Sequence, residues 1–75
     1  MQTLEQLTTG QLTGIKALTL KEGITTFPKE IYSLADTLER LDMTGNALSD
    51  LPDDFHMLKN LKILFLSNNN FTVLP

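Results

Sequence analysis

The sequence predicts an α/β solenoid in which short strands from successive repeats align into a parallel β-sheet on a concave face. Three observations predict it. Apolar residues recur with a fixed period, the spacing that separates Leu38 from Leu61, and inside each copy they alternate with polar or variable residues as in a strand. A short segment with its own helix signals precedes the first copy. Because one copy cannot bury its apolar edge alone, the copies must stack, and we expect a piece of a horseshoe.

The N-terminal segment, residues 1–14, is expected to be a helical cap. Thr3 can cap a short helix, Leu4 and Leu7 fall on one face of it, and Gly10 can end it. Terminal repeats of a solenoid need a cap with a polar outer face over their core, and this segment is placed to supply one.

The first repeat, residues 15–37, is a degenerate copy. The apolar residues around its strand lie one period before those of the next copy and are Ile15, Leu18 and Leu20. One residue is missing after this strand. The first repeat therefore has no counterpart of Asn46, and Gly23-Ile24 occupies its turn.

The second repeat, residues 38–60, and the third, residues 61–75, match position by position, and the third is truncated before its return segment. The matched residues of the second repeat are Leu38, Leu41, Met43, Asn46, Leu48, Leu51 and Pro52. Their counterparts, each one period later, are Leu61, Leu64, Leu66, Asn69, Phe71, Leu74 and Pro75. Chance does not produce such a series, so the repeat is real.

Each repeat is expected to contain a strand and a return segment. The inward strand residues are Leu18 with Leu20, Leu41 with Met43, and Leu64 with Leu66. Apolar residues three apart suit a turn of helix or 3₁₀ structure that returns over the core; they are Ile31 with Leu34, and Phe55 with Leu58. Pro52, Asp53 and Asp54 are expected to form the first turn of a helix, because proline has no N–H to lose there and carboxylates favour that end.

Asn46 and Asn69 are expected to form a structural ladder. Both follow a strand, where the backbone turns inward and its polar groups lose their strand partners. An Asn side chain both donates and accepts hydrogen bonds, so it can satisfy these groups. The repeat spacing already explains both residues without a ligand role.

The residues that alternate with the inward ones are expected to form a partner-binding concave face. They are Ala17, Thr19, Lys21, Arg40, Asp42, Thr44, Ile63, Phe65 and Ser67. Ile63 and Phe65 are exposed apolar residues flanked by the Arg40 and Asp42 charges, a composition typical of interface anchors with a polar rim. The alternative is that Ile63 and Phe65 only favour strand formation.

Composition argues against several other classes. The net charge is −3 and no stretch gathers basic residues, which disfavours nucleic acid as a partner. The absence of cysteine excludes disulfides and thiolate metal sites. No signal peptide or membrane-spanning run is found, so we expect a cytoplasmic protein, and the sequon at Asn70-Phe71-Thr72 is interpreted as accidental.

No catalytic, cofactor or metal site is expected. His56 lies on the return segment, away from the strand face, and is interpreted as a solvated surface residue. A metal site from Asp50, Asp53 and Asp54 is the alternative use of these carboxylates, but they lack the spacing of a calcium-binding loop. No phosphate-binding loop or dinucleotide motif occurs.

These residues resemble the leucine-rich-repeat family, most strongly from Leu38 onward. The L-P-x-x-φ-x-x-L tail from Leu51 to Leu58 is similar to the short intracellular class of that family. The leader helix, Phe27-Pro28 and the L-P-D-D run at 51–54 resemble the start of bacterial proteins in which such repeats precede a protein-kinase-like domain. The resemblance implies a horseshoe whose concave strand face binds partners.

The expected function is therefore protein–protein interaction by a module of a larger protein, with no enzyme activity in this chain. The alternative is an N-terminal regulatory or substrate-recruiting arm of a multidomain protein-kinase-like enzyme, whose catalytic residues would lie beyond Pro75. We also expect self-association through the C-terminal edge at Leu74-Pro75, because no further repeat covers it.

Overall fold

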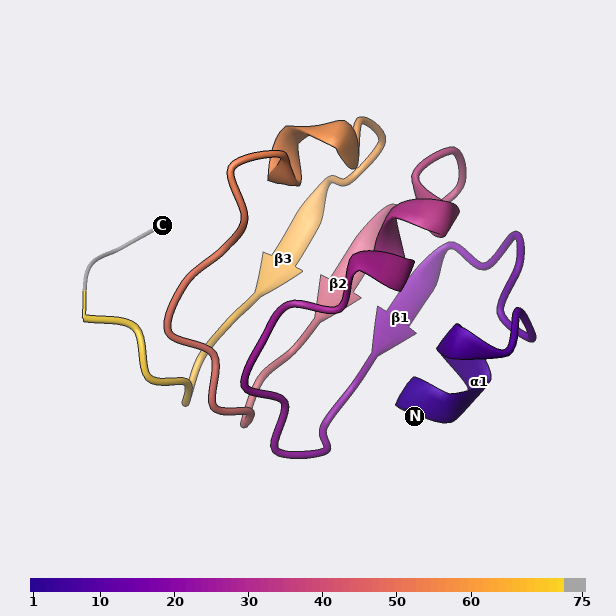
Figure 1. The fold of residues 1–75 in the computed structure, drawn as a ribbon. Helices are drawn as coiled ribbons and strands as arrows, with labels where there is room; N and C mark the ends of the chain where they lie inside the picture. Colours follow the sequence, from indigo (N-terminus) through magenta and orange to yellow (C-terminus); the bar gives the residue numbers. More distant parts are fainter. Residues whose placement is uncertain (73–75) are drawn as a thin grey trace.

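The computed structural model describes residues 1–72, which form an α/β repeat fold with three short parallel strands in one sheet (Figure 1). The strands are β1 (Ala17–Thr19), β2 (Arg40–Asp42) and β3 (Ile63–Phe65), and they lie in the order β1-β2-β3. Each strand starts one period after the strand before it, as the repeat spacing predicts. Leu74 and Pro75 of the third repeat lie outside the described residues.

The register of the sheet follows the repeat spacing. Thr19, Asp42 and Phe65 form one row across the three strands, as predicted. The same backbone hydrogen bonds recur one repeat apart at the start of the strands. The N–H groups of residues 39 and 40 donate to the carbonyl of residue 16 at 2.8 and 3.0 Å, and those of residues 62 and 63 donate to the carbonyl of residue 39 at 2.8 and 3.1 Å. Equal spacing therefore places equivalent residues directly beside one another.

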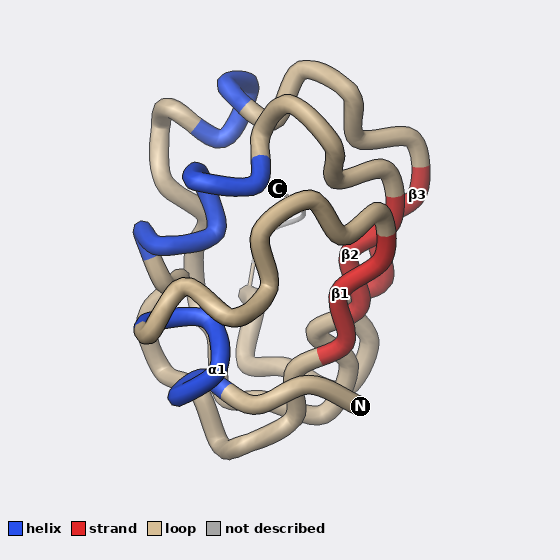
Figure 2. The backbone as a smooth tube through the Cα atoms, turned by 90° about the vertical axis from the view of Figure 1, so that its right-hand side faces the viewer, coloured by secondary structure: helices blue, strands red, loops and turns tan. Residues whose placement is uncertain are grey.

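The return segments form a second layer opposite the sheet (Figure 2). They are the 3₁₀ helices η1 (Lys29–Leu34) and η2 (Phe55–Met57), which confirms the predicted type of structure. The two segments contact each other through aromatic side chains, since the rings of Phe27 and Phe55 lie edge to face at 5.5 Å. The Tyr32 hydroxyl also donates a 2.7 Å hydrogen bond to Asp54, and desolvation together with this bond raises the pKa of Tyr32 to about 12.

The prediction that Pro52, Asp53 and Asp54 form the first turn of a helix is wrong. η2 begins at Phe55, and Asp54 precedes it without a side-chain capping bond. The Phe55 N–H donates to the Pro52 carbonyl at 3.1 Å, so these residues form a turn before the helix. A 3₁₀ segment of three residues has too few aligned peptide groups to attract carboxylates through a dipole.

The core lies between the sheet and the return segments. Its completely buried side chains are Leu18, Leu20, Ile31, Leu38, Leu41, Met43 and Leu48, which confirms the predicted inward residues of the first two strands. Leu64 and Leu66 are only half-buried, although they match Leu41 and Met43 in the repeat. Among residues 1–72 no further repeat packs against β3, so the third repeat has one open side.

The N-terminal helix α1 (Leu4–Thr8) lies beside β1, on the side away from β2 (Figure 1). Thr3 and Gln6 form a reciprocal capping box, and Leu7 is buried in the core. The residue before the cap reaches the sheet: the Gln2 N–H donates to the Thr19 carbonyl at 3.0 Å, and the Thr19 N–H donates to the Gln2 side-chain oxygen at 2.8 Å. The outer edge of β1 is thereby hydrogen-bonded at Thr19.

A left-handed residue follows each strand where the backbone turns inward. Gly23, Gly45 and Asn68 have φ values of 65°, 79° and 57°. Glycine and asparagine tolerate this conformation better than other residues, which explains their use at these positions. The turn exposes backbone groups that the next residue, Asn46 in the second repeat, can reach.

Asn46 joins the first two repeats through four hydrogen bonds. Its side-chain oxygen accepts from the N–H groups of Glu22 and Ile24 at 3.0 and 3.1 Å. Its side-chain nitrogen donates to the carbonyls of Leu20 and Met43, both at 2.8 Å. Because Asn46 serves the turn of the repeat before it, the first repeat is satisfied without an Asn of its own.

Asn69 makes the equivalent bonds one repeat later. Its oxygen accepts from the Leu48 N–H at 3.0 Å, and its nitrogen donates to the carbonyls of Met43 and Leu66 at 2.9 and 3.0 Å. The two side chains thus bond to backbone groups at matching positions of adjacent repeats.

We predict that Asn46→Ala lowers the free energy of unfolding by about 1–3 kcal/mol, because it leaves buried backbone groups without partners. Urea unfolding followed by circular dichroism measures the change. His56→Ala serves as the control, since the exposed His56 side chain should be replaceable within about 0.5 kcal/mol. Equal unfolding free energies for the two variants would show that the Asn46 bonds do not hold the repeats together.

Candidate functional site

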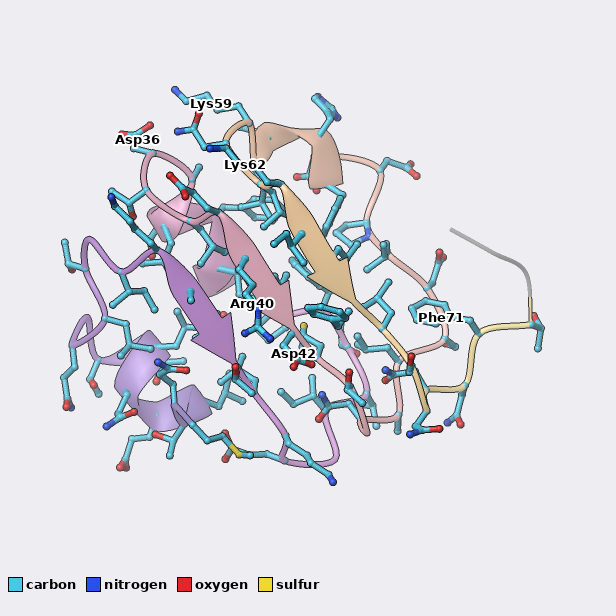
Figure 3. All side chains as sticks on the ribbon, turned by 180° about the vertical axis from the view of Figure 1, so that it is seen from behind. Asp36, Arg40, Asp42, Lys59, Lys62 and Phe71 are labelled. Carbon is cyan, nitrogen blue, oxygen red and sulfur yellow. The ribbon has the colours of Figure 1, made fainter. Side chains whose placement is uncertain are left out.

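The outward residues of the three strands form a continuous surface, here called the outer sheet face (Figure 3). It consists of Ala17, Thr19, Lys21, Arg40, Asp42, Thr44, Ile63, Phe65 and Ser67. Their neighbours Leu18 and Leu41 are completely buried, so alternation along each strand turns this set toward solvent. The structure therefore places all the candidate site residues of the concave face on one surface.

The apolar part of the outer sheet face lies on β3. Ile63 is 46% exposed and Phe65 is 42% exposed, two residues apart on the same side of the strand. Exposed large apolar side chains also occur at Met57 on η2, in the opposite layer, and at Met1, whose neighbour Gln2 is hydrogen-bonded to Thr19. An exposed apolar pair on a strand can anchor a binding partner, because covering it removes apolar surface from water.

Arg40 lies against this apolar pair. Its guanidinium carbon is 5.0 Å from the centre of the Phe65 ring, and its Nη2 is 3.8 Å from Oδ2 of Asp42. The guanidinium thus lies over the Phe65 ring and beside the Asp42 carboxylate, both of which attract its positive charge. Since the Arg40 side chain is still 42% exposed, its remaining N–H groups can donate to a bound molecule.

Asp42 is held by the turn that follows β2. The Thr44 N–H donates to Oδ1 of Asp42 at 3.0 Å. This backbone bond lowers the pKa of Asp42, with further help from the Thr44 side chain and from Arg40, while burial opposes the shift. Asp42 therefore remains ionised beside Arg40, and the face presents both signs of charge.

Sequence reasoning missed a row of charged residues at the start of the strands. Lys16, Glu39 and Lys62 precede the three strands, each one period after the last. Lys62 Nζ lies 4.0 Å from Oε1 of Glu39. The repeat spacing already contained the signal, because residues one period apart must lie side by side.

Lys21 occupies the other end of β1. Its aliphatic chain lies over the turn after β2: a side-chain carbon added at Gly45 would come within 2.8 Å of Cε of Lys21. Gly45 thus leaves room for Lys21, besides providing the positive φ of its turn.

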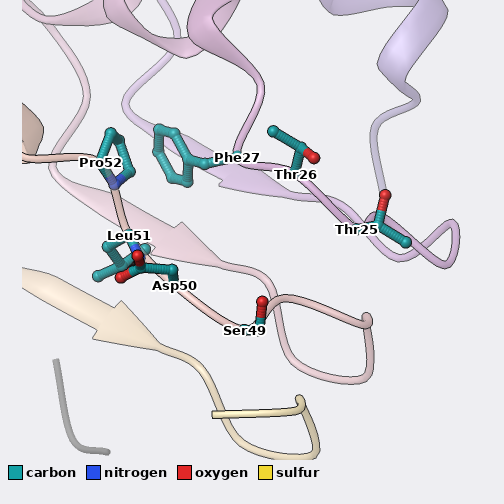
Figure 4. Close-up of a pocket in the computed structure, with 7 residues that line it drawn as sticks. All are labelled: Thr25, Thr26, Phe27, Ser49, Asp50, Leu51 and Pro52. Carbon is teal, nitrogen blue, oxygen red and sulfur yellow. Dashed lines mark hydrogen bonds between the residues drawn. The ribbon is translucent and has the colours of Figure 1, made fainter.

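A shallow hollow lies between the first two repeats on the path from strand to return segment (Figure 4). It has a volume of about 280 Å³ and is lined by Thr25, Thr26, Phe27, Ser49, Asp50, Leu51 and Pro52. The Asp50 carboxylate already accepts from the Leu51 N–H at 2.8 Å. The polar residues that line the hollow, Thr25, Thr26, Ser49 and Asp50, are exposed to solvent.

Residues 1–72 offer little support for a metal site, a catalytic histidine or a membrane span. These residues bring together no group of three or more metal-ligating His, Asp or Glu side chains. His56 is exposed on η2, with Nδ1 3.3 Å from the Asp53 carbonyl oxygen, on the layer opposite the sheet. In the same range no helix is long and apolar enough to cross a bilayer.

Comparison with known proteins agrees with the repeat geometry. A family model described as Leucine Rich repeats (2 copies) matches residues 36–75. Chaoptin from Tribolium castaneum is 32% identical over 56 residues, which cover 73% of this chain and 7% of Chaoptin. The chain thus spans a small part of that relative's length. No solved structure matches the chain.

We predict that Asp42→Asn lowers the free energy of unfolding at pH 7 by up to about 1 kcal/mol. The pKa of Asp42 is lower in the folded state than in the unfolded state, so its carboxylate stabilises the fold above about pH 4. This contribution to the free energy of unfolding is lost as the pH falls through the folded-state pKa. Urea unfolding at pH 7 and pH 3 should therefore show a difference that shrinks in acid. Asp36→Asn is the control, since the exposed Asp36 carboxylate forms an ion pair with the exposed Lys59. An effect of Asp42→Asn that does not change with pH would show that the Asp42 charge does not stabilise the fold.

Proposed function

The chain belongs to the leucine-rich-repeat family, and from this membership we propose that its outer sheet face binds a protein partner. Leucine-rich-repeat domains generally mediate protein–protein interaction. The observation that carries the proposal is the exposed pair Ile63 and Phe65, with the Arg40 guanidinium stacked on the Phe65 ring. A rigid aromatic anchor with a positioned arginine is a composition enriched where binding energy is concentrated.

The size of the surface limits what it can do alone. Three strands about 4.8 Å apart span roughly 10 by 14 Å, well below the roughly 800 Å² per partner of a stable interface. We therefore propose that this chain is part of a longer solenoid with a concave sheet, in which further repeats extend the face. Its repeats would be 15–37, 38–60 and 61–75, with residues 1–14 as the cap, an arrangement supported by the buried Leu7 and by the Gln2 bonds to Thr19.

A second candidate function is the recruiting arm of a larger cytoplasmic enzyme. Its support is the resemblance of Phe27-Pro28 and the L-P-D-D run at 51–54 to bacterial proteins that carry a protein-kinase-like domain after their repeats. The parent gene tests it directly. A glycine-rich loop, a strand lysine and an H-R-D segment after residue 75 would establish this reading, and a sequence without them would remove it.

We predict that Phe65→Ala combined with Arg40→Ala weakens partner capture and leaves the melting temperature within a few degrees, because both side chains lie outside the core and are 42% exposed. Immobilised wild type, this double variant and the control Met57→Ala with His56→Ala are compared as baits. The control removes an exposed apolar and a polar side chain from η2, in the opposite layer. A photo-crosslinking residue at position 63 then shows whether the captured protein touches β3. Equal capture by all three baits would place the site elsewhere.

We also propose that the open side of β3 pairs with a second copy of this chain. Leu64 and Leu66 are half-buried there, and β3 has only one strand neighbour among residues 1–72. Apolar edges of this kind seek partners.

We predict that the weight-average mass in sedimentation equilibrium rises with concentration, and that Leu66→Lys reduces the rise by placing a charge on this edge. Met57→Lys, which adds the same charge at an exposed residue of η2, should leave the association unchanged. A monomer at every concentration would contradict the proposal.

A further inference from the structure

The outer sheet face differs in charge from the rest of the molecule. The outer sheet face, with Lys21, Arg40 and Asp42, carries a net charge of +1, and the row of Lys16, Glu39 and Lys62 that borders it at the strand starts adds +1, so the two together carry +2. The whole chain is at −3, so the remaining residues carry −5. The following inference rests on the proposed function, in which the outer sheet face binds a protein. We propose that this partner presents an acidic segment with an apolar side chain that covers Ile63 and Phe65.

The basic side chains on this face are available to a partner. Within residues 1–72, neither Lys16 nor Lys21 has a carboxylate within 4.0 Å. Lys62 and Arg40 face carboxylates only at 4.0 and 3.8 Å, near the limit of an ion pair. Exposed pairs of this length contribute little, so a bound carboxylate can replace them without a large loss.

Two of the four basic residues adjoin the apolar pair, and the other two lie beside β1, on the far side of β2. Lys62 immediately precedes Ile63, and Arg40 is paired with Ile63 across the sheet while its guanidinium covers Phe65. Lys16 lies in the same row as Lys62, and Lys21 lies beyond the other end of β1. A partner side chain seated on Ile63 and Phe65 would therefore have Arg40 and Lys62 beside it, and carboxylates further along the partner could reach Lys16 and Lys21, two strands away.

The charge balance favours an acidic protein segment over the other occupants of such a face. Binding of a nucleic acid gains its affinity from several phosphate contacts that release counterions, and a net charge of +2 with two carboxylates in place is small for that purpose. Asp42 and Glu39 also give the surface alternating sign, which discriminates among protein partners. The predicted occupant is thus a short acidic stretch with one large apolar anchor.

Three eight-residue peptides test the inference on the complete, isotope-labelled chain by nuclear magnetic resonance titration. Each has a central Leu-Phe pair with three flanking residues on either side, which are all Glu, all Gln or all Lys. The Glu peptide should bind about 5- to 10-fold more tightly than the Gln peptide in ~20 mM salt, with amide shifts in β2 and β3, and the Lys peptide should bind least. In ~300 mM salt the preference should fall to about 2-fold.

Matched variants locate the charges responsible. The double variant Lys16→Gln with Lys21→Gln should bind the Glu peptide about 3- to 10-fold more weakly than the wild type. The control Lys29→Gln with Lys59→Gln, which changes the net charge equally, should bind it less than about 2-fold more weakly. Asp42→Asn, which keeps an acceptor for Thr44, should strengthen binding of the Glu peptide. Equal losses in the two lysine pairs would overturn the inference.

Three other results would also overturn the inference. Equal binding of the Glu and Gln peptides in low salt, with both weakened by Phe65→Ala, would overturn the acidic partner and leave the proposed binding face intact. Binding of none of the peptides would overturn the inference, while capture by the immobilised chain would still test the face itself. Amide shifts of the outer sheet face that depend on the chain's own concentration, without peptide, would identify a second copy as its occupant and overturn the inference.

Discussion

The strands of this sheet are three residues long, too short to hold their relative positions by strand hydrogen bonds alone, so their alignment depends on the asparagine amides that follow them. Asn46 bonds to backbone groups of two repeats at once, and Asn69 continues the series. The polar groups released by each inward turn are thereby satisfied inside the protein. The repeats can stack and bury their core because these polar groups have partners.

The same alignment creates the outer sheet face. Because the register joins Asp42 to Phe65 and Arg40 to Ile63, the guanidinium of Arg40 can reach the Phe65 ring diagonally. A slip of one residue would turn these side chains into the core and expose leucines instead. The register that buries the core leucines therefore also determines which side chains lie on the outer sheet face.

Burial decreases along the stack. The strand leucines of the first two repeats are fully buried; α1 lies beside β1, and β2 lies between β1 and β3. Within the part of the chain that the structure describes, Leu64 and Leu66 have a neighbouring repeat on one side only, and they are half-buried. A repeat protein gains stability at each interface between repeats, and among residues 1–72 the third repeat has one such interface where the second has two.

The sequence by itself determined the period, the strands, the inward residues, the asparagine positions and the return segments, which it left open as helix or 3₁₀; the structure shows 3₁₀. A constant period relates equivalent atoms of neighbouring repeats, and strand alternation then assigns each side chain to a face. Only the tertiary structure decided how outward side chains meet, such as Arg40 over Phe65, Lys21 over Gly45 and the Gln2 bonds to Thr19. It also decided that Pro52 and Asp53 form a turn rather than a helix. Such contacts depend on rotamers and on the packing of neighbouring segments, which a pattern of residue types along the chain does not specify.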